Sequence, residues 1–334
     1  MLKIMLSFLV KNILHVLVVI VVMILFYISY MTFTEVYENT NNKYVYGSAI
    51  DTIEKRFTER IDFYRMSLKA LVKNKRVATY ASEGKNIEDV EELFVHMKNS
   101  LPDLFQIRYL DNTGMEKIRV DGEASSLFGD KSQVRVRDKN GLQNKSKKQY
   151  FKDFIDLAPY KIGLSEISLN KDFGRVTLPK QPTLRMGIAV YGETVEPQGV
   201  IIFNVSLRYI FNRLVDSNLY DVHIVDNQGN FILHHDSQYG LIGENKNYKL
   251  QDEYPQIYQK ILNSNEYISH TIFSKKIQNL DNSQELILFL SKQKKEIGWM
   301  QIIQNKNLVV IFMIITFILI VLLISIGKQL REDT

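Results

Sequence analysis

The sequence of 334 residues contains no cysteine. No disulfide can therefore stabilise the fold, and the absence of thiols suits an oxidising compartment. Common enzyme motifs are also absent: there is no Gly-x-Ser-x-Gly nucleophile elbow, no phosphate-cradling glycine loop and no His-Glu-x-x-His helix. We therefore expect neither an enzyme nor a cofactor. The net charge of +5 is dispersed without a basic block, which argues against a nucleic-acid partner.

Two stretches, 13–33 and 308–326, lack Asp, Glu, Lys and Arg altogether. At about 1.5 Å per residue each is long enough to cross a hydrocarbon core of roughly 30 Å, so the sequence predicts two membrane spans, with the lipid bilayer as a partner. Buried core helices are the less favoured alternative. The first stretch is too long for a cleaved signal peptide, and no small-x-small cleavage site follows it.

Lysine and arginine residues near these stretches indicate the orientation. Lys3 and Lys11 precede the first stretch, and Lys328 and Arg331 follow the second. Cytoplasmic flanks carry the excess of positive residues, so tails 1–12 and 327–334 are expected in the cytoplasm and residues 34–307 outside it. Tail 327–334 is too short for a domain, so we expect the output to lie outside this sequence. The sequence is then the sensing half of a split system, the product of a shortened gene, or a piece cut after the second stretch.

The segment 34–100 is predicted to hold two helices. The first is expected from about Val36 to Tyr80, because apolar residues recur every three or four positions and so share one helix face. These residues are Ile50, Ile53, Phe57, Ile61, Tyr64, Leu68 and Leu71. The stripe fits packing against the chain's own domain or a coiled-coil contact in a homodimer. The second helix is expected to begin after Asn86, a good N-cap, and to end near 99–102.

Two stretches resemble each other as β-hairpins: FQIRYLDNTGMEKIRVD at 105–121 and YDVHIVDNQGNFILHHD at 220–236. Four of the 17 aligned positions are identical, and both turns follow an Asp-Asn-x-Gly pattern in which glycine supplies a positive φ. Strands are expected to follow each copy, at 183–190 and 198–206 in the first and at 266–273, 286–292 and 299–303 in the second. The sequence therefore predicts an α+β tandem of related modules, 101–206 and 220–305, joined by a linker helix at 207–219.

This arrangement resembles the double Cache sensor domains of bacterial transmembrane receptors such as histidine kinases and diguanylate cyclases. The blocks GLQNKSKKQYFKDF, IGLSEISLNKDFG, PKQPTLRMGIAVY and GVIIFNVSLRYIF carry the resemblance together with the first hairpin. It implies two PAS-like modules with antiparallel sheets on a long N-terminal helix, one membrane-distal and one membrane-proximal, between two transmembrane helices. It also implies location in the bacterial inner membrane, with the sensor in the periplasm.

The resemblance implies a small-molecule site in the first module. Family members that bind amino acids carry an Arg, an aromatic pair and an Asp, which hold the ligand's carboxylate and ammonium groups. Carried onto this sequence, those positions fall on Lys148, on Tyr150 and Phe151, and on Asn204. Because both charged anchors differ, we expect a small carboxylate or other anion, with Lys148 and Arg185 as positive groups, and not a typical amino acid. The alternatives of core aromatics and a solvated lysine remain open.

The sequence His234-His235-Asp236 invites a metal interpretation. Adjacent residues of a regular strand point to opposite faces, however, so no metal site is expected, although His223 on the partner strand could approach one of these histidines. The resulting hypothesis is a receptor subunit that senses a small extracytoplasmic ligand and signals to a cytoplasmic kinase, cyclase or chemotaxis partner. The alternative is a membrane-tethered solute-binding or envelope-complex protein without signalling output.

Overall fold

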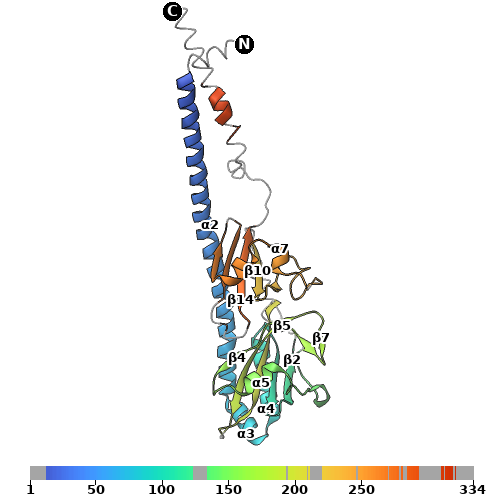
Figure 1. Ribbon diagram of the computed structural model, residues 1–334. Coiled ribbons are helices and arrows are strands. Elements are labelled where there is room, and N and C mark those ends of the chain that lie inside the picture. Colours follow the sequence, from blue (N-terminus) through green and yellow to red (C-terminus); the bar gives the residue numbers. More distant parts are fainter. Residues whose placement is uncertain are drawn as a thin grey trace, which may run out of the picture. The chain divides into compact units, whose positions relative to one another are not determined.

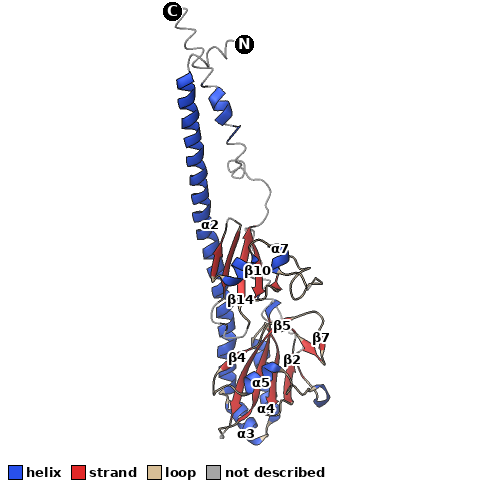
Figure 2. Cartoon of the chain, in the orientation of Figure 1, coloured by secondary structure: helices blue, strands red, loops and turns tan. Residues whose placement is uncertain are grey.

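A computed structural model describes residues 13–122, 134–192, 195–208, 210, 220–245, 247–269, 271–277, 280, 284–292, 310–311, 313–318 and 320. These residues form an α+β fold of antiparallel sheets and one long helix (Figures 1 and 2). The chain divides into two compact units: Tyr46–Gln293, and a second that combines Met1–Val45 with Lys294–Thr334. Both sheets belong to the first of these units.

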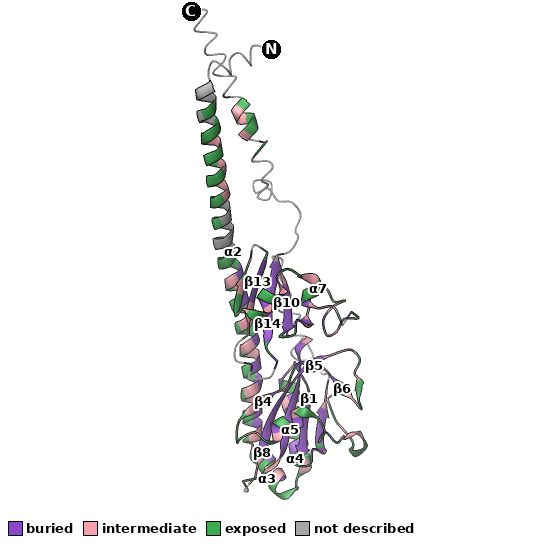
Figure 3. Cartoon of the chain, viewed as in Figure 1, coloured by how far each residue is buried: buried purple, intermediate pink, exposed green. Residues whose placement is uncertain are grey.

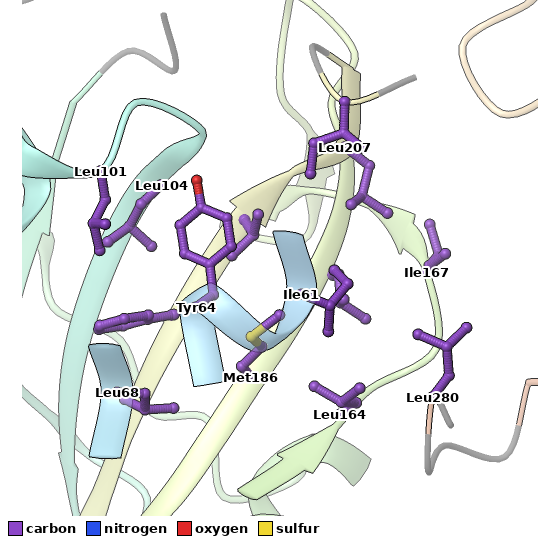
Figure 4. Close-up of a cluster of buried hydrophobic side chains, with 14 of the residues drawn as sticks. Ile61, Tyr64, Leu68, Leu101, Leu104, Leu164, Ile167, Met186, Leu207 and Leu280 are labelled. Atoms are coloured by element: carbon purple, nitrogen blue, oxygen red, sulfur yellow. The ribbon is translucent and has the colours of Figure 1, made fainter. Parts of the chain in front are cut away.

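The long helix α2 (Ile13–Val72) supplies the central core element of the unit Tyr46–Gln293. All seven residues of the predicted stripe are buried in one apolar cluster with residues of both sheets, and Figure 4 shows Ile61, Tyr64 and Leu68 within it. The packing interpretation of the stripe is therefore confirmed. A coiled-coil contact through the same face would compete with that core.

The first helix ends earlier than predicted. α2 stops at Val72 and a separate helix, α3 (Lys75–Glu83), begins after Asn74, whose side-chain Oδ1 accepts a hydrogen bond from the Arg76 N–H at 3.0 Å. That capping contact explains the break, because it satisfies a backbone donor that a continuous helix would have paired. The next helix, α4 (Ile87–Ser100), lies where it was predicted.

The first sheet belongs to the first module and has the strand order β3-β2-β1-β9-β8-β4, with β5 also paired to β8. Its strands are β1 (Leu104–Asp111), β2 (Glu116–Asp121), β3 (Arg135–Val136), β4 (Ile162–Leu164), β5 (Ser168–Leu169), β8 (Pro182–Tyr191) and β9 (Pro197–Ser206). A short 3-10 helix η1 (Lys139–Gly141), the helix α5 (Gln149–Ile155) and a small ribbon of β6 (Lys171–Asp172) and β7 (Arg175–Val176) complete the module.

The second sheet has the order β11-β10-β14-β13-β12. Its strands are β10 (Tyr220–Asp226), β11 (Phe231–Leu233), β12 (Glu266–Ile268), β13 (Ile272–Lys276) and β14 (Leu286–Lys292), with the short helices α7 (Leu250–Glu253) and α8 (Tyr258–Asn263) between β11 and β12. In both sheets the hairpin's first strand pairs with the module's last described strand, which pairs in turn with the strand before it. The two modules therefore share one topology.

The two hairpin turns use the same chemistry. Asp111 Oδ1 accepts hydrogen bonds from the N–H groups of Thr113 and Met115, and Asp226 Oδ1 accepts them from Gln228 and Asn230. The glycines of the two turns, Gly114 and Gly229, have φ values of 82° and 75°, a region that favours glycine. The sequence repeat is therefore also a repeat of local structure.

The first sheet separates two layers. One face packs on α2, and the other carries α5, which contacts β8 and β9 through an apolar cluster of Leu110, Phe151, Phe154, Val200 and Ile202. The central strands are almost entirely buried (Figure 3). Polar residues on the α5 face of these strands are consequently inside the protein.

Among the described residues, no helix is both long enough and apolar enough for a membrane span. Most of the predicted linker 207–219, the strand predicted at 299–303 and parts of 308–326 lie outside the described residues.

Candidate functional site

A row of polar residues crosses the α5 face of the first sheet. The strand register pairs Arg185 on β8 with Asn204 on β9, Asn204 with Gln106 on β1, and Gln106 with Asp121 on β2. The next row holds Gly187, Ile202, Arg108 and Arg119 in the same strand order. Side chains on one face alternate along each strand, so the register brings four strands' polar groups into one layer. We refer to Gln106, Arg108, Tyr150, Arg185 and Asn204 as the polar cluster.

Arg108 lies at the centre of this cluster and is only 3% exposed. Its guanidinium donates to Asn204 Oδ1 at 2.8 Å and to the Tyr150 hydroxyl at 3.2 Å, and it pairs with the buried Glu116 at 3.3 Å. Burial alone would lower the pKa of Arg108, but Tyr150 and Glu116 raise it above its ordinary value. Arg108 Nε is buried without a hydrogen-bond partner among the described residues, so one donor of this guanidinium is free for a ligand.

Arg185 is the second buried guanidinium, at 8% exposure. It donates to Ser168 Oγ at 3.0 Å and lies 5.3 Å from the centre of the Tyr150 ring. Within the described part of the chain it has no carboxylate partner, and burial together with the charge of Arg108 lowers its pKa to about 10. A buried cation without a counter-ion is costly, and a bound anion would remove that cost.

Tyr150 connects the two arginines. Its ring centre is 5.5 Å from the Arg108 guanidinium and 5.3 Å from that of Arg185. Burial would raise the pKa of its hydroxyl, but the charge and hydrogen bond of Arg108, with help from Arg185, lower it below the ordinary value. The ring is held there because α5 packs directly on the sheet, where Phe154 fills the space above Gly187.

The structure brings together three of the predicted site residues: Tyr150, Arg185 and Asn204. Lys148 is exposed at the N-terminal end of α5, outside the polar cluster. Phe151 is buried in the apolar cluster beneath α5. The buried lysine near the arginines is Lys145, which donates to Gln143 Oε1 at 2.7 Å and whose pKa is lowered by burial and by Arg108.

The β2 side of the layer is rich in ion pairs. Arg119 donates to Asp121 at 2.9 Å and to Asp172 at 3.0 Å, and Arg137 also pairs with Asp121. A cavity of about 290 Å³ adjoins these pairs. Its lining includes Gln106 and Arg119 from the two polar rows and Arg208. The volume is near the lower end of ligand pockets, so a small molecule would fit beside the polar cluster.

The polar cluster, together with the ion pairs and Lys145 beside it, carries more positive than negative charge. Its cations are Arg108, Arg119, Arg137, Arg185 and Lys145, and its carboxylates are Glu116, Asp121 and Asp172. The described groups therefore leave an excess of two positive charges in a mostly buried region. Such a field favours an anionic ligand.

Arg108, Gln106 and Lys145 were missed from the sequence. The signal for the first two was present, because Gln106 and Arg108 alternate with Phe105, Ile107 and Tyr109 along one strand. That alternation usually marks a solvent face, and only the α5 layer makes it an interior one. Lys145 could not be distinguished from Lys147 and Lys148 without the local turn.

The topology and the buried polar layer define a tandem PAS-like sensor domain of the Cache type. A sequence model of the family "Bacterial histidine kinase, sensor domain" matches residues 52–272. The chain therefore belongs to that family. Among curated proteins no match was found.

Solved structures agree in fold. The extracellular domain of vpHK1S-Z8, a protein designated a histidine kinase, has a TM-score of 0.64 and 20% identity over 77% of this chain and 93% of that one. A domain of a sensory box/GGDEF family protein from Vibrio parahaemolyticus has a TM-score of 0.65 and 20% identity, over 77% and 98% of the two chains. The sensory domain of the Campylobacter jejuni chemoreceptor Tlp3, solved with isoleucine bound, has a TM-score of 0.55 and 12% identity, over 78% and 96%. The chain thus carries a sensor domain with the fold of the extracellular sensor domains found in bacterial receptors.

Proposed function

We propose that this sensor binds a small carboxylate or comparable anion at the polar cluster of the first module. The observation that carries the proposal is Arg185, a buried guanidinium next to Arg108 that has no carboxylate partner among the described residues. An anion beside Arg185, Arg108 and the Tyr150 hydroxyl would receive charge-assisted hydrogen bonds. The cavity of about 290 Å³ shares Gln106 with the polar cluster and is large enough for a small molecule.

The same geometry argues against an α-amino acid. An ammonium group requires a carboxylate, but position 204 holds an asparagine whose Oδ1 already accepts from Arg108 and whose Nδ2 donates to Gln106 at 2.7 Å. Glu116 is engaged by Arg108, and Asp121 by Arg119. The ammonium group of an amino acid would therefore enter a site that already has excess positive charge and no free carboxylate among the groups named here. Isoleucine binding by Tlp3 belongs to a protein only 12% identical to this chain.

A thermal-shift screen of the full chain in detergent, with small carboxylates, inorganic anions and amino acids, tests the proposal. We expect stabilisation by at least one amine-free anion, because a ligand that binds only the folded state raises the unfolding temperature. The variant Arg185→Gln should lose that shift. Stabilisation by anions that persists in Arg185→Gln would contradict the assignment.

Lys148→Gln is the matched control for Lys145→Gln. Both substitutions remove one lysine charge from the same segment, but Lys148 is exposed and Lys145 is buried near Arg108. We expect Lys145→Gln to weaken anion binding and Lys148→Gln to leave it nearly unchanged, since exposed charges are screened by solvent. The reverse order would restore the assignment made from the sequence.

The proposed role includes two membrane spans, a homodimer and signal relay to a cytoplasmic kinase, cyclase or chemotaxis partner; the chain itself would catalyse no reaction. Support for the first span is that eight apolar residues of α2 are more than half exposed, an arrangement that suits lipid: Leu17, Val21, Val22, Ile24, Leu25, Phe26, Ile28 and Phe33. Labelling of single engineered cysteines with a membrane-impermeant thiol reagent tests the topology. Equal labelling at position 2 and position 236 in intact cells would contradict it.

Helix α2 is the proposed relay. Arg60 and Tyr64 bond to Asp103 in the first module at 2.7 and 3.0 Å, and Lys275 in the second module pairs with Asp51 at 2.6 Å. A ligand that shifts the first sheet would therefore bias the helix, provided it binds one arrangement more tightly. Crosslinking of cysteines placed along residues 34–45, with and without the ligand, measures that shift; identical crosslinking patterns would exclude the helix as relay.

A further inference from the structure

Three imidazoles meet in the second module. The rings of His223, His234 and His235 have centre-to-centre distances of 4.5 to 4.9 Å, and one nitrogen from each lies within 4.8 Å of the other two. The strand β11 ends at Leu233, so the two adjacent histidines follow the strand and are not held on opposite faces. The argument from strand geometry against a metal site therefore does not apply.

The triad occupies the place of the arginines in the first module. The aligned hairpins put His223 at the position of Arg108 and His234 at the position of Arg119, and in the first sheet those two arginines face each other across the strand pair. His223 lies on the face of the second sheet that the apolar cluster of α7 and α8 covers, as Arg108 lies beneath α5. The duplicated fold therefore positions imidazoles where the first module positions guanidinium groups.

His223 is prepared to act as a ligand. It is fully buried, its Nε2 is bonded to Ser291 Oγ at 3.0 Å, and its Nδ1 has no hydrogen-bond partner among the described residues. An imidazole nitrogen that is buried and has no hydrogen-bond partner is available to bind a metal ion.

His234 has the environment of an oriented metal ligand. The Asp236 N–H donates to its Nδ1 at 3.0 Å, which leaves the ring proton on Nε2, where it is donated to Glu253 Oε2 at 2.8 Å. A carboxylate on the outer nitrogen of a ligating histidine fixes its tautomer and raises its basicity. An ion would take the Nδ1 lone pair that the Asp236 N–H now shares.

We propose that His223, His234 and His235 bind one divalent transition-metal ion, for which Zn²⁺ is the reference. Imidazole nitrogens suit Zn²⁺, Ni²⁺, Cu²⁺ and Co²⁺, and three histidines leave a fourth position for water or another small ligand. Zn–N bonds of about 2.0–2.1 Å require ligand nitrogens roughly 3.3 Å apart, so the three rings need to close by no more than about 1.5 Å. The exposed His235 gives the ion a route from solvent. The site is distinct from the proposed anion site in the first module.

Titration of the full, untagged chain in detergent with Zn²⁺ alone, and with Co²⁺ followed by its visible absorption, tests the proposal. We expect one ion per chain. His235→Gln, at an exposed position, should weaken binding at least 10-fold, and Glu253→Gln should weaken it about 10- to 100-fold by releasing the His234 ring. His96→Gln is the matched control, because His96 is exposed on α4 and far from the triad in sequence; it should bind as the unsubstituted chain does.

Three results would overturn the proposal: no saturable binding of either ion, binding unchanged in His235→Gln, or binding lost equally in His96→Gln. Circular dichroism of each variant shows whether it folds. Because none of these substitutions touches the polar cluster of the first module, the anion proposal stands or falls separately.

Discussion

Gly187 on β8 sets how closely α5 approaches the first sheet. A methyl group added there would lie 2.6 Å from Phe154 Cε2 and closer still to Cγ and Cδ2. Carbon atoms pack at about 3.5–4.0 Å, so Gly187→Ala must push the nearest atoms of the Phe154 ring, and α5 with them, about 1.5 Å or more from the sheet. Overpacking of this kind costs about 1–3 kcal/mol, and the rigid ring places this case near the upper value. Tyr150 lies on the same helix, so anion binding should weaken as well.

A double-mutant cycle with Phe154→Ala, measured by urea unfolding of the full chain in detergent, checks this reasoning. Phe154→Ala alone should cost about 3–5 kcal/mol because it leaves a cavity. The new methyl group of Gly187→Ala would partly fill that cavity, so the double variant should be no less stable than Phe154→Ala. Gly47→Ala is the control for a glycine substitution without overpacking: it lies in a helix with open space around it, so it should stabilise the protein by about 0.5–1 kcal/mol. If the costs of Gly187→Ala and Phe154→Ala simply add in the double variant, the packing argument is refuted.

Three further predictions concern stability. Asp103→Asn should destabilise by about 3 kcal/mol in denaturant titrations because it leaves the Arg60 guanidinium without its counter-charge. Asp62→Asn, at an exposed ion pair, should cost less than about 1 kcal/mol. Equal costs would contradict the assigned burial of Asp103. Gly229→Ala should cost about 1 kcal/mol at its φ of 75°, and an unchanged unfolding midpoint would argue against the turn. Burial alone would raise the pKa of Asp121, but hydrogen bonds from Arg119 hold it below the ordinary value. The ionised carboxylate therefore stabilises the fold above about pH 4, and this stabilisation is lost as the pH falls further. Asp121→Asn should consequently flatten the acid side of a plot of melting temperature against pH.

The architecture was largely predictable because it depends on periodicity. The apolar stripe of α2 and the paired Asp-Asn-x-Gly turns are local patterns, and the structure confirms both. The end of α2 was predicted about eight residues too late, because the Asn74 cap is one side-chain contact that periodicity does not reveal.

The site was less predictable because it depends on which layer covers which face. Asn204 and Arg185 were among the residues predicted from the sequence, but their neighbour Arg108 was not, since an arginine on an alternating strand normally faces solvent. The proposed metal site was not expected from the sequence, because that expectation assumed a regular strand that includes His234, whereas β11 ends one residue earlier. For Arg108 the deciding information was the contact with α5, which lies about 40 residues away in the sequence.

The most direct test of the proposed function is calorimetric titration of the full chain with ligand pairs that differ by one ammonium group, such as succinate and aspartate or propionate and alanine. If Arg185 and Arg108 form an anion site without a counter-charge for an amine, at least one amine-free carboxylate of such pairs should bind more tightly than its amino-acid partner, and Arg185→Gln should abolish the difference. Micromolar binding of several α-amino acids, with weaker binding of their amine-free partners, would contradict the proposal.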